Sequence, residues 1–187
     1  MKYVLSLVAF STLLSFRQVD GIYGIAMKTI DGNKLELSQY KGKKLLFMVI
    51  PVSADDATIS VNDIARLQTK YQNSVVIIGV PSEEAGYKTQ DAGTLKKIFR
   101  DATANIIIAE GMKVKKGTTQ SFLFQWLTNK DMNHHFDRDV DGVGSKFFVD
   151  EGGELYAVTG PNFSLTNPLI DRILTRSPGK SSKENKN

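Results

Sequence analysis

The alternating carboxylates Asp137, Asp139 and Asp141 have the spacing of a metal-binding loop. A glycine follows directly, giving a D-x-D-x-D-G pattern whose oxygen ligands and tight turn can wrap a calcium ion. An EF-hand would carry a bidentate glutamate at the twelfth position, where this chain has Phe148 in an apolar segment. The pattern therefore favours a solvated loop, with a calcium-binding module as the alternative.

A histidine pair, His134 and His135, stands just before this loop. With the neighbouring aspartates it offers nitrogen and oxygen ligands that suit a transition metal. A surface pair in a loop is the simpler interpretation. We therefore predict no metal or other cofactor.

Cysteine is missing from all 187 residues. The thiolate is the nucleophile in thiol redox chemistry, and other common side chains do not replace it easily. The chain can also form no disulfide, and it cannot carry the cysteine-linked lipid of a bacterial lipoprotein. Any reaction that it catalyses must use other groups.

Composition and charge limit the classes of partner. Hydrophobic residues make up 41% of the chain, enough for the core of one domain without a disulfide or a metal. The net charge is only +4, and no stripe of basic and aromatic residues occurs. Nucleic-acid binding is therefore not predicted.

The two ends of the chain differ from its body. Residues 1–20 contain one early lysine and an apolar run from Tyr3 to Phe16, typical of a signal peptide or N-terminal leader. The run is shorter than the roughly 20 residues of a membrane span. Residues 177–187 are small, polar and charged, which predicts a disordered basic tail. The folded domain is predicted over residues 21–176.

The leader predicts an exported protein, periplasmic or extracellular, with no stable membrane span once the leader is removed. No small-x-small pattern marks a cleavage site before Asp20. An uncleaved anchor or an amphipathic leader is therefore the alternative.

Apolar periodicity predicts alternating strands and helices between these ends. Continuous apolar runs indicate buried strands, and apolar residues three and four apart indicate helices. The predicted elements are a hairpin around 34–38, strands at 44–52, 74–80 and 105–109, helices at 58–71, 93–101 and 119–128, a hairpin at 146–150 and 155–158, and a last helix from Thr166-Asn167 with Pro168 in its first turn. This order predicts an α/β domain whose central sheet is covered on both faces.

Three segments resemble the glutathione peroxidase family. They are Ile22-Tyr23 with Asp31-Gly32-Asn33 and the stretch 37–43, the strand that ends at Pro81, and the stretch 146–153. The resemblance covers roughly residues 22–176. It implies a thioredoxin-like fold with a central mixed sheet flanked by helices and an N-terminal β-hairpin.

The resemblance also locates the family's catalytic positions, and all four are substituted. Ungapped counting places the peroxidatic cysteine position on Ala54 and the glutamine position on Glu84. The tryptophan-asparagine pair corresponds to Gly142 and Val143. The resemblance thus implies a vestigial pocket that also includes Ser53, Asp55, Asp56 and Glu83.

These substitutions favour a protein that binds over one that reduces peroxides. Carboxylates beside the pocket would destabilise a thiolate or a departing hydroxide. We therefore expect a non-catalytic protein that binds another protein or a small-molecule ligand. The alternative is an enzyme with residual or altered activity, in which Glu83, Glu84, Asp55 and Asp56 act as acid-base groups with separated pKa values.

Overall fold

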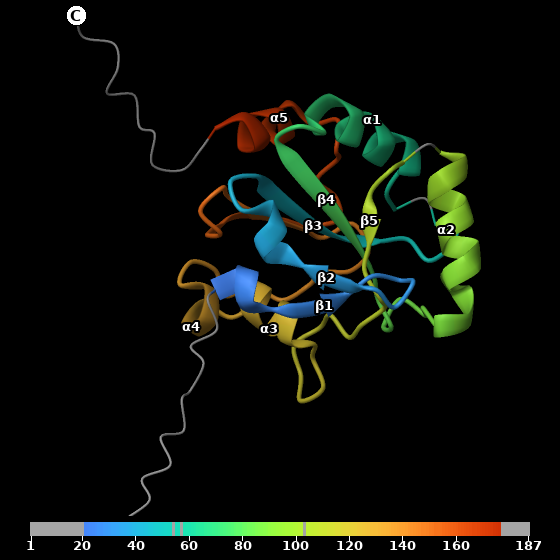
Figure 1. Ribbon diagram of the computed structural model, residues 1–187, viewed down its shortest axis with the longest axis horizontal. Helices are drawn as coiled ribbons and strands as arrows, with labels where there is room; N and C mark the ends of the chain where they lie inside the picture. The colour runs from blue at the N-terminus through green and yellow to red at the C-terminus, as the bar shows by residue number, and fades with distance from the viewer. Residues whose placement is uncertain (1–20, 54, 57, 103, 177–187) are drawn as a thin grey trace, which may run out of the picture.

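A mixed sheet forms the centre of the computed structural model (Figure 1), with strands in the order β5-β4-β3-β6-β7. β3 (Lys44–Ile50) pairs in parallel with β4 (Val75–Pro81), which pairs in parallel with β5 (Ile107–Ile108). On its other side β3 pairs antiparallel with β6 (Lys146–Val149), and β6 with β7 (Leu155–Thr159). The predicted central mixed sheet is therefore confirmed.

The structure describes residues 21–53, 55–56, 58–102 and 104–176. The predicted leader 1–20, the predicted tail 177–187 and Ala54 lie outside the described residues. The division into leader, domain and tail stays a prediction.

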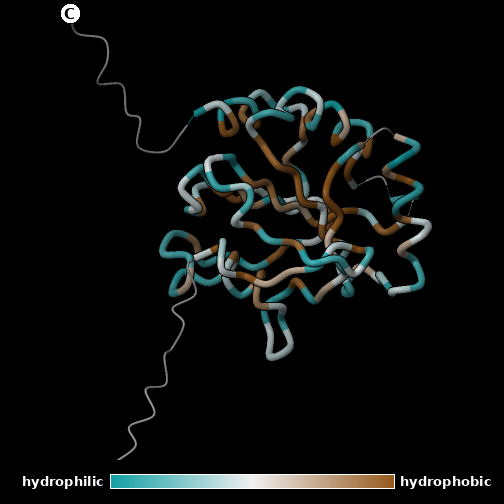
Figure 2. The backbone as a smooth tube through the Cα atoms, in the orientation of Figure 1, coloured by the Kyte–Doolittle hydropathy of each residue, from teal (hydrophilic) through white to brown (hydrophobic). Residues whose placement is uncertain are grey.

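The two central strands are apolar because both faces of the sheet are covered. Every residue of β3 is buried. Alternate side chains of a strand point to opposite faces, so Phe47 contributes to one core cluster and Met48 to the other. Figure 2 shows the hydrophobic colour concentrated along these inner strands.

Helices cover one face of the sheet. α1 (Val61–Tyr71), α2 (Ala92–Asp101) and α5 (Pro168–Thr175) pack their apolar sides on the cluster that contains Met48. In Figure 1 they lie along the top and the right-hand side of the molecule. The apolar sides of these helices shield the core from solvent, and their polar sides face outward.

A hairpin and a short helix cover the opposite face. β1 (Ala26–Lys28) pairs antiparallel with β2 (Lys34–Glu36), and α3 (Phe122–Thr128) lies beside them (Figure 1). Met27, Leu35 and Trp126 belong to the core cluster on this face. The predicted N-terminal β-hairpin is therefore confirmed, with a thioredoxin-like arrangement of layers.

Short helical turns connect the larger elements. They are the 3-10 turns η1 (Gly21–Gly24), η2 (Leu37–Tyr40) and η3 (Thr89–Asp91), and the single helical turn α4 (Lys130–Asn133). No periodicity in the sequence predicted α4. Its cap is the side chain of Asn129, which accepts a hydrogen bond from the backbone N–H of Asp131.

Two predicted helices begin three residues later than expected. The helix expected from residue 58 begins at Val61, because Ser60 is extended and its side chain accepts a hydrogen bond from the N–H of Asp63. The helix expected from residue 119 begins at Phe122, after the extended Ser121. In both cases an extended serine occupies the position before the helix, but only the side chain of Ser60 forms a capping hydrogen bond.

Candidate functional site

A pocket of about 1130 Å³ lies between helix α2 and the loop that joins β3 to α1. The predicted residues Ser53, Asp55 and Asp56 line it. The loop is held locally: the carboxylate of Asp56 accepts a hydrogen bond of 2.9 Å from the N–H of Thr58. The structure thus brings together three members of the predicted pocket, and Ala54 lies outside the described residues.

The pocket carries an excess of negative charge. Four of its lining residues are aspartates, at positions 55, 56, 91 and 101, and its lining lysine is Lys97. Lys97 is ion-paired with Asp101, and its hydrogen bond lowers the pKa of that carboxyl below the ordinary value. Three carboxylates are left without a lysine or arginine partner among the lining residues, so a positively charged ligand is the complementary one.

Ser53 is the hydroxyl of this pocket, and it is exposed. A serine nucleophile needs an adjacent base within hydrogen-bond reach. In the described part of the chain, no side chain forms a hydrogen bond with the Ser53 hydroxyl. The geometry therefore offers Ser53 for ligand contact and no activation as a nucleophile.

Glu84 is turned to a different part of the molecule. Its carboxylate accepts hydrogen bonds from the Ser82 hydroxyl at 2.7 Å, from the Val114 N–H at 3.1 Å and from the Lys115 N–H at 3.2 Å. Partial burial alone would raise the pKa of Glu84, but these hydrogen bonds bring it below the ordinary value. Glu84 thus fastens the loop at Val114 to the end of β4.

The four carboxylates suggested for acid-base chemistry do not share one pocket. Asp55 and Asp56 line the pocket beside α2, whereas neither Glu83 nor Glu84 is among its described lining residues. Glu83 is exposed to solvent. The predicted set is therefore split between two places.

Gly142 and Val143 lie in the turn before β6. This turn is joined to the end of β3, because the N–H of Gly144 donates to the carbonyl of Val49 at 2.7 Å. Gly142 has a φ of 142°, a conformation that side chains with a Cβ rarely adopt. A tryptophan, the family's residue at this position, would be strained there.

The carboxylates of the D-x-D-x-D-G loop bond to nearby basic and backbone groups. Asp137 is ion-paired with the ammonium of Lys116, and Asp139 accepts a hydrogen bond of 2.9 Å from the N–H of Lys116. Asp141 accepts one of 2.7 Å from the guanidinium of Arg138. In the part of the chain that the structure describes, no group of three acidic, histidine or cysteine side chains could hold a metal ion.

The histidine pair is also divided. His134 ends helix α4 in the left-handed conformation, with a φ of 65°. His135 lies 3.0 Å from a carboxylate oxygen of Glu154. The two rings therefore have different surroundings.

Lys146 is a notable residue that the sequence analysis did not single out. It is only 1% exposed, and its ammonium donates to the carbonyls of Gly144 at 2.6 Å and Gly160 at 3.4 Å. Burial lowers the pKa of Lys146 from 10.5 to about 8. A lysine directly before three apolar strand residues was the signal for such a buried cation.

Comparisons with known proteins place the fold. No family model and no curated protein matches the chain. The apo form of the glutathione peroxidase Trgpx is 16% identical with a TM-score of 0.61, covering 84% of this chain and 99% of that one. GPX1 of T. cruzi, also a glutathione peroxidase, is 18% identical with a TM-score of 0.62, covering 82% and 94%.

A thioredoxin-family thiol:disulfide interchange protein from Chlorobium tepidum TLS is 14% identical with a TM-score of 0.52, covering 80% of this chain and 90% of that one. At these identities the likeness is one of fold. The chain therefore has the thioredoxin-like fold, and it is similar in structure to glutathione peroxidases while containing no cysteine.

Proposed function

We propose that this chain is a glutathione-peroxidase-like protein that acts by binding and has no thiol peroxidase activity. The observation that supports this most strongly is the complete absence of cysteine from a chain with this fold. In thiol peroxidase chemistry a thiolate attacks the peroxide bond and expels hydroxide or alkoxide. A chain without a thiol has no nucleophile for that step.

The surroundings of the pocket support the same proposal. Asp55 and Asp56 add negative charge where a thiolate and a departing hydroxide would need donors. The carboxylate of Glu84 is bonded to the loop at Val114 and is not available to replace the family's glutamine. The pocket beside α2, with its volume of about 1130 Å³, is the proposed binding site for a protein segment or small ligand, most favourably a cationic one.

A coupled hydroperoxide-reduction assay tests the absence of peroxidase activity. The wild-type chain is compared with Ala54→Cys and with the matched Ala54→Ser, using thioredoxin and then glutathione as the reductant. We expect no turnover from the wild type or the serine variant and slow turnover from the cysteine variant. Turnover by the wild type would contradict the proposal.

We further propose that the protein is exported. The lysine at position 2 and the apolar run from Tyr3 to Phe16 support this location. Within the described residues, no helix is long and apolar enough to cross a membrane. N-terminal sequencing of the mature protein after cell fractionation tests the proposal, since retention of an intact N-terminus in the cytosol contradicts it.

A further inference from the structure

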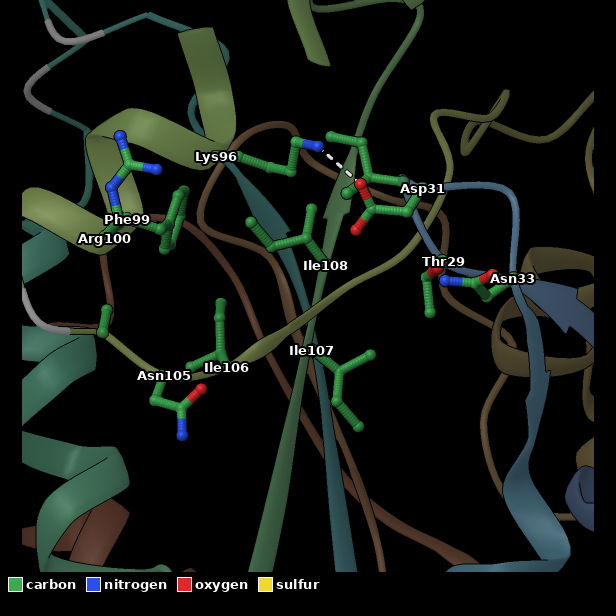
Figure 3. A pocket seen from close by; sticks show the side chains of 12 residues that line it. Thr29, Asp31, Asn33, Lys96, Phe99, Arg100, Asn105, Ile106, Ile107 and Ile108 are labelled. Atoms are coloured by element: carbon green, nitrogen blue, oxygen red, sulfur yellow. Dashed lines mark hydrogen bonds and ion pairs between the residues drawn. The ribbon is translucent and has the colours of Figure 1, made fainter. Parts of the chain in front are cut away.

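A second pocket, of about 500 Å³, lies on the other side of helix α2 (Figure 3). Strand β5 and the turn after β1 form its remaining walls. The half-buried Ile106 and Ile107 supply apolar surface, with the buried Phe99 and Ile108 behind them. Its volume falls in the range of about 300–1000 Å³ that is usual for ligand pockets.

The pocket contains an unpaired stretch of the sheet edge. The N–H of Ala109 donates to the carbonyl of Gly79 in β4, and on the opposite side the carbonyl of Ile108 accepts from the N–H of Ile30, both at 2.9 Å. Backbone groups of successive strand residues point to alternate sides. Ile106 therefore presents its N–H and C=O outward, and no described residue forms a hydrogen bond with either.

A positively charged residue, Arg100, lies near the start of this edge. The N–H of Ala104 donates to the carbonyl of Phe99 at 2.9 Å, so the edge begins beside the last turn of α2, which carries Arg100. The Arg100 side chain is exposed and forms no ion pair or hydrogen bond with the other described residues. Its neighbour Asp101 is already paired with Lys97.

The end of the pocket at Asp31 is close to neutral. Lys96 extends from α2 across the pocket to Asp31 in the turn after β1, and the two side chains form an ion pair (Figure 3). Asn33 and Thr29 lie at the same end. The pocket therefore has an apolar wall, an open backbone edge and one cation, Arg100, that forms no hydrogen bond or ion pair with the other described residues.

We propose that this pocket binds a short extended peptide, which adds as a strand to the edge at Asn105–Ile107 and places its C-terminal carboxylate against Arg100. Strand addition would give the outward N–H and C=O of Ile106 their missing partners. An antiparallel peptide brings its C-terminus to the Ala104 end, where the guanidinium can bind a carboxylate with two hydrogen bonds. An apolar final side chain would face the apolar lining that the half-buried Ile106 supplies.

The pocket at Arg100 and the pocket at Ser53 use different residues of α2. Lys97 and Ile98 of α2 line that pocket, whereas Phe99 and Arg100 line this one. Loss of binding at one pocket therefore leaves the other testable.

Nuclear magnetic resonance titration of the full chain tests the proposal. The probes are three N-acetyl tripeptides that end in valine, leucine or phenylalanine, each as the free acid and as the C-terminal amide. We expect the amide signals of Ile106 and Ile108 to shift with at least one acid, and the matching amide to bind about tenfold more weakly. No shift at millimolar acid, or equal binding of acid and amide, would overturn the proposal.

Variants and methylated peptides separate the two contacts. Arg100→Gln is expected to remove the preference for the acid, whereas Arg172→Gln, an exposed arginine on α5, keeps it. Two N-methylated versions of the peptide are compared, one with the methyl group on a nitrogen that faces the edge and one with it on the next nitrogen. Only every second N–H faces the edge, so we expect the first version to bind about tenfold more weakly and the second to bind as the unmethylated peptide does. Equal binding of both versions would show a ligand held without strand pairing and would contradict the proposal.

Discussion

The ammonium of Lys44, at the start of β3, donates a hydrogen bond of 2.6 Å to the carbonyl of Arg176. The same group donates to the carbonyl of Leu174 at 3.0 Å. The last carbonyls of a helix have no partner within the helix, and a cation is favoured there. A buried lysine of the central strand therefore caps helix α5 and attaches it to the sheet.

Replacing this cap is expected to destabilise the protein. Lys44→Met leaves the carbonyls of Leu174 and Arg176 without their donor, at an expected cost of about 2 kcal/mol in the free energy of unfolding. Chemical denaturation measures the change. Lys43→Met, at the neighbouring half-buried position, is the control and is expected to change stability by less than about 0.5 kcal/mol. Equal losses for the two variants would contradict the capping role.

Lys146 is expected to make stability depend on pH in the alkaline range. Its pKa is about 8 in the folded chain and 10.5 ordinarily, so the unfolded chain binds more protons between these values. Stability from this group therefore rises with pH from about 8 to about 10.5, by a total on the order of 3 kcal/mol. Below about pH 8 the buried lysine is charged, and its charge lowers the free energy of unfolding.

The variant Lys146→Met removes this titration. We expect the stability difference between variant and wild type to favour the variant at about pH 7 and to shrink steadily as the pH rises through the window. Denaturation curves at a series of pH values measure the difference. A difference that stays constant with pH would show that the pKa of Lys146 is the same in the folded and unfolded chain.

Glu84 is expected to hold the loop at Val114 in place. Glu84→Ala removes the acceptor of Val114 and Lys115, and we expect faster hydrogen exchange at both amides and a loss of about 1–2 kcal/mol in stability. Glu83→Ala is the control and should change neither, because the Glu83 side chain forms no hydrogen bond with the other described residues. Because the pKa of Glu84 is lowered on folding, its contribution is present above the unfolded pKa and is lost as pH falls through the folded one.

Gly142 and Gly93 are expected to respond in opposite ways to alanine. Gly142 has a positive φ, so Gly142→Ala is expected to cost about 1 kcal/mol or more, although no atom lies within 4 Å of the new Cβ. Gly93 lies within helix α2 with equally open space, and Gly93→Ala is expected to add up to about 1 kcal/mol of stability. Thermal unfolding of both variants checks the signs, and two losses would refute the backbone argument.

The order of the elements could be predicted from the sequence because strands that are buried on both faces of the sheet are continuous apolar runs. The apolar run at Leu45 to Ile50 and the helical spacing around Ile64 and Leu67 gave the correct element types. The helix starts were wrong because Ser60 and Ser121 precede helices, and periodicity alone does not distinguish a cap from a first turn. The single turn α4 is too short to show a period.

The pocket could be predicted only in part. Counting along the chain brought Ser53, Asp55 and Asp56 to one loop, and the structure places all three on one pocket. The contribution of Asp91 and Lys97 depends on how α2 packs across the sheet, which spacing within the chain does not encode. The partners of Glu84 likewise lie 30 and 31 residues away.

The bridge between Thr29 and Ala109 has a consequence for self-association. β5 is an edge strand of the sheet. The unpaired backbone groups of an exposed edge strand can pair with any extended chain, including another copy of the protein. The segment from Lys28 to Ile30 lies against β5 and forms backbone hydrogen bonds with Ile108 and Glu110. The open stretch at Ile106 can pair with one short peptide but is too short to template a growing sheet. The segment from Lys28 to Ile30 therefore also protects this edge against aggregation.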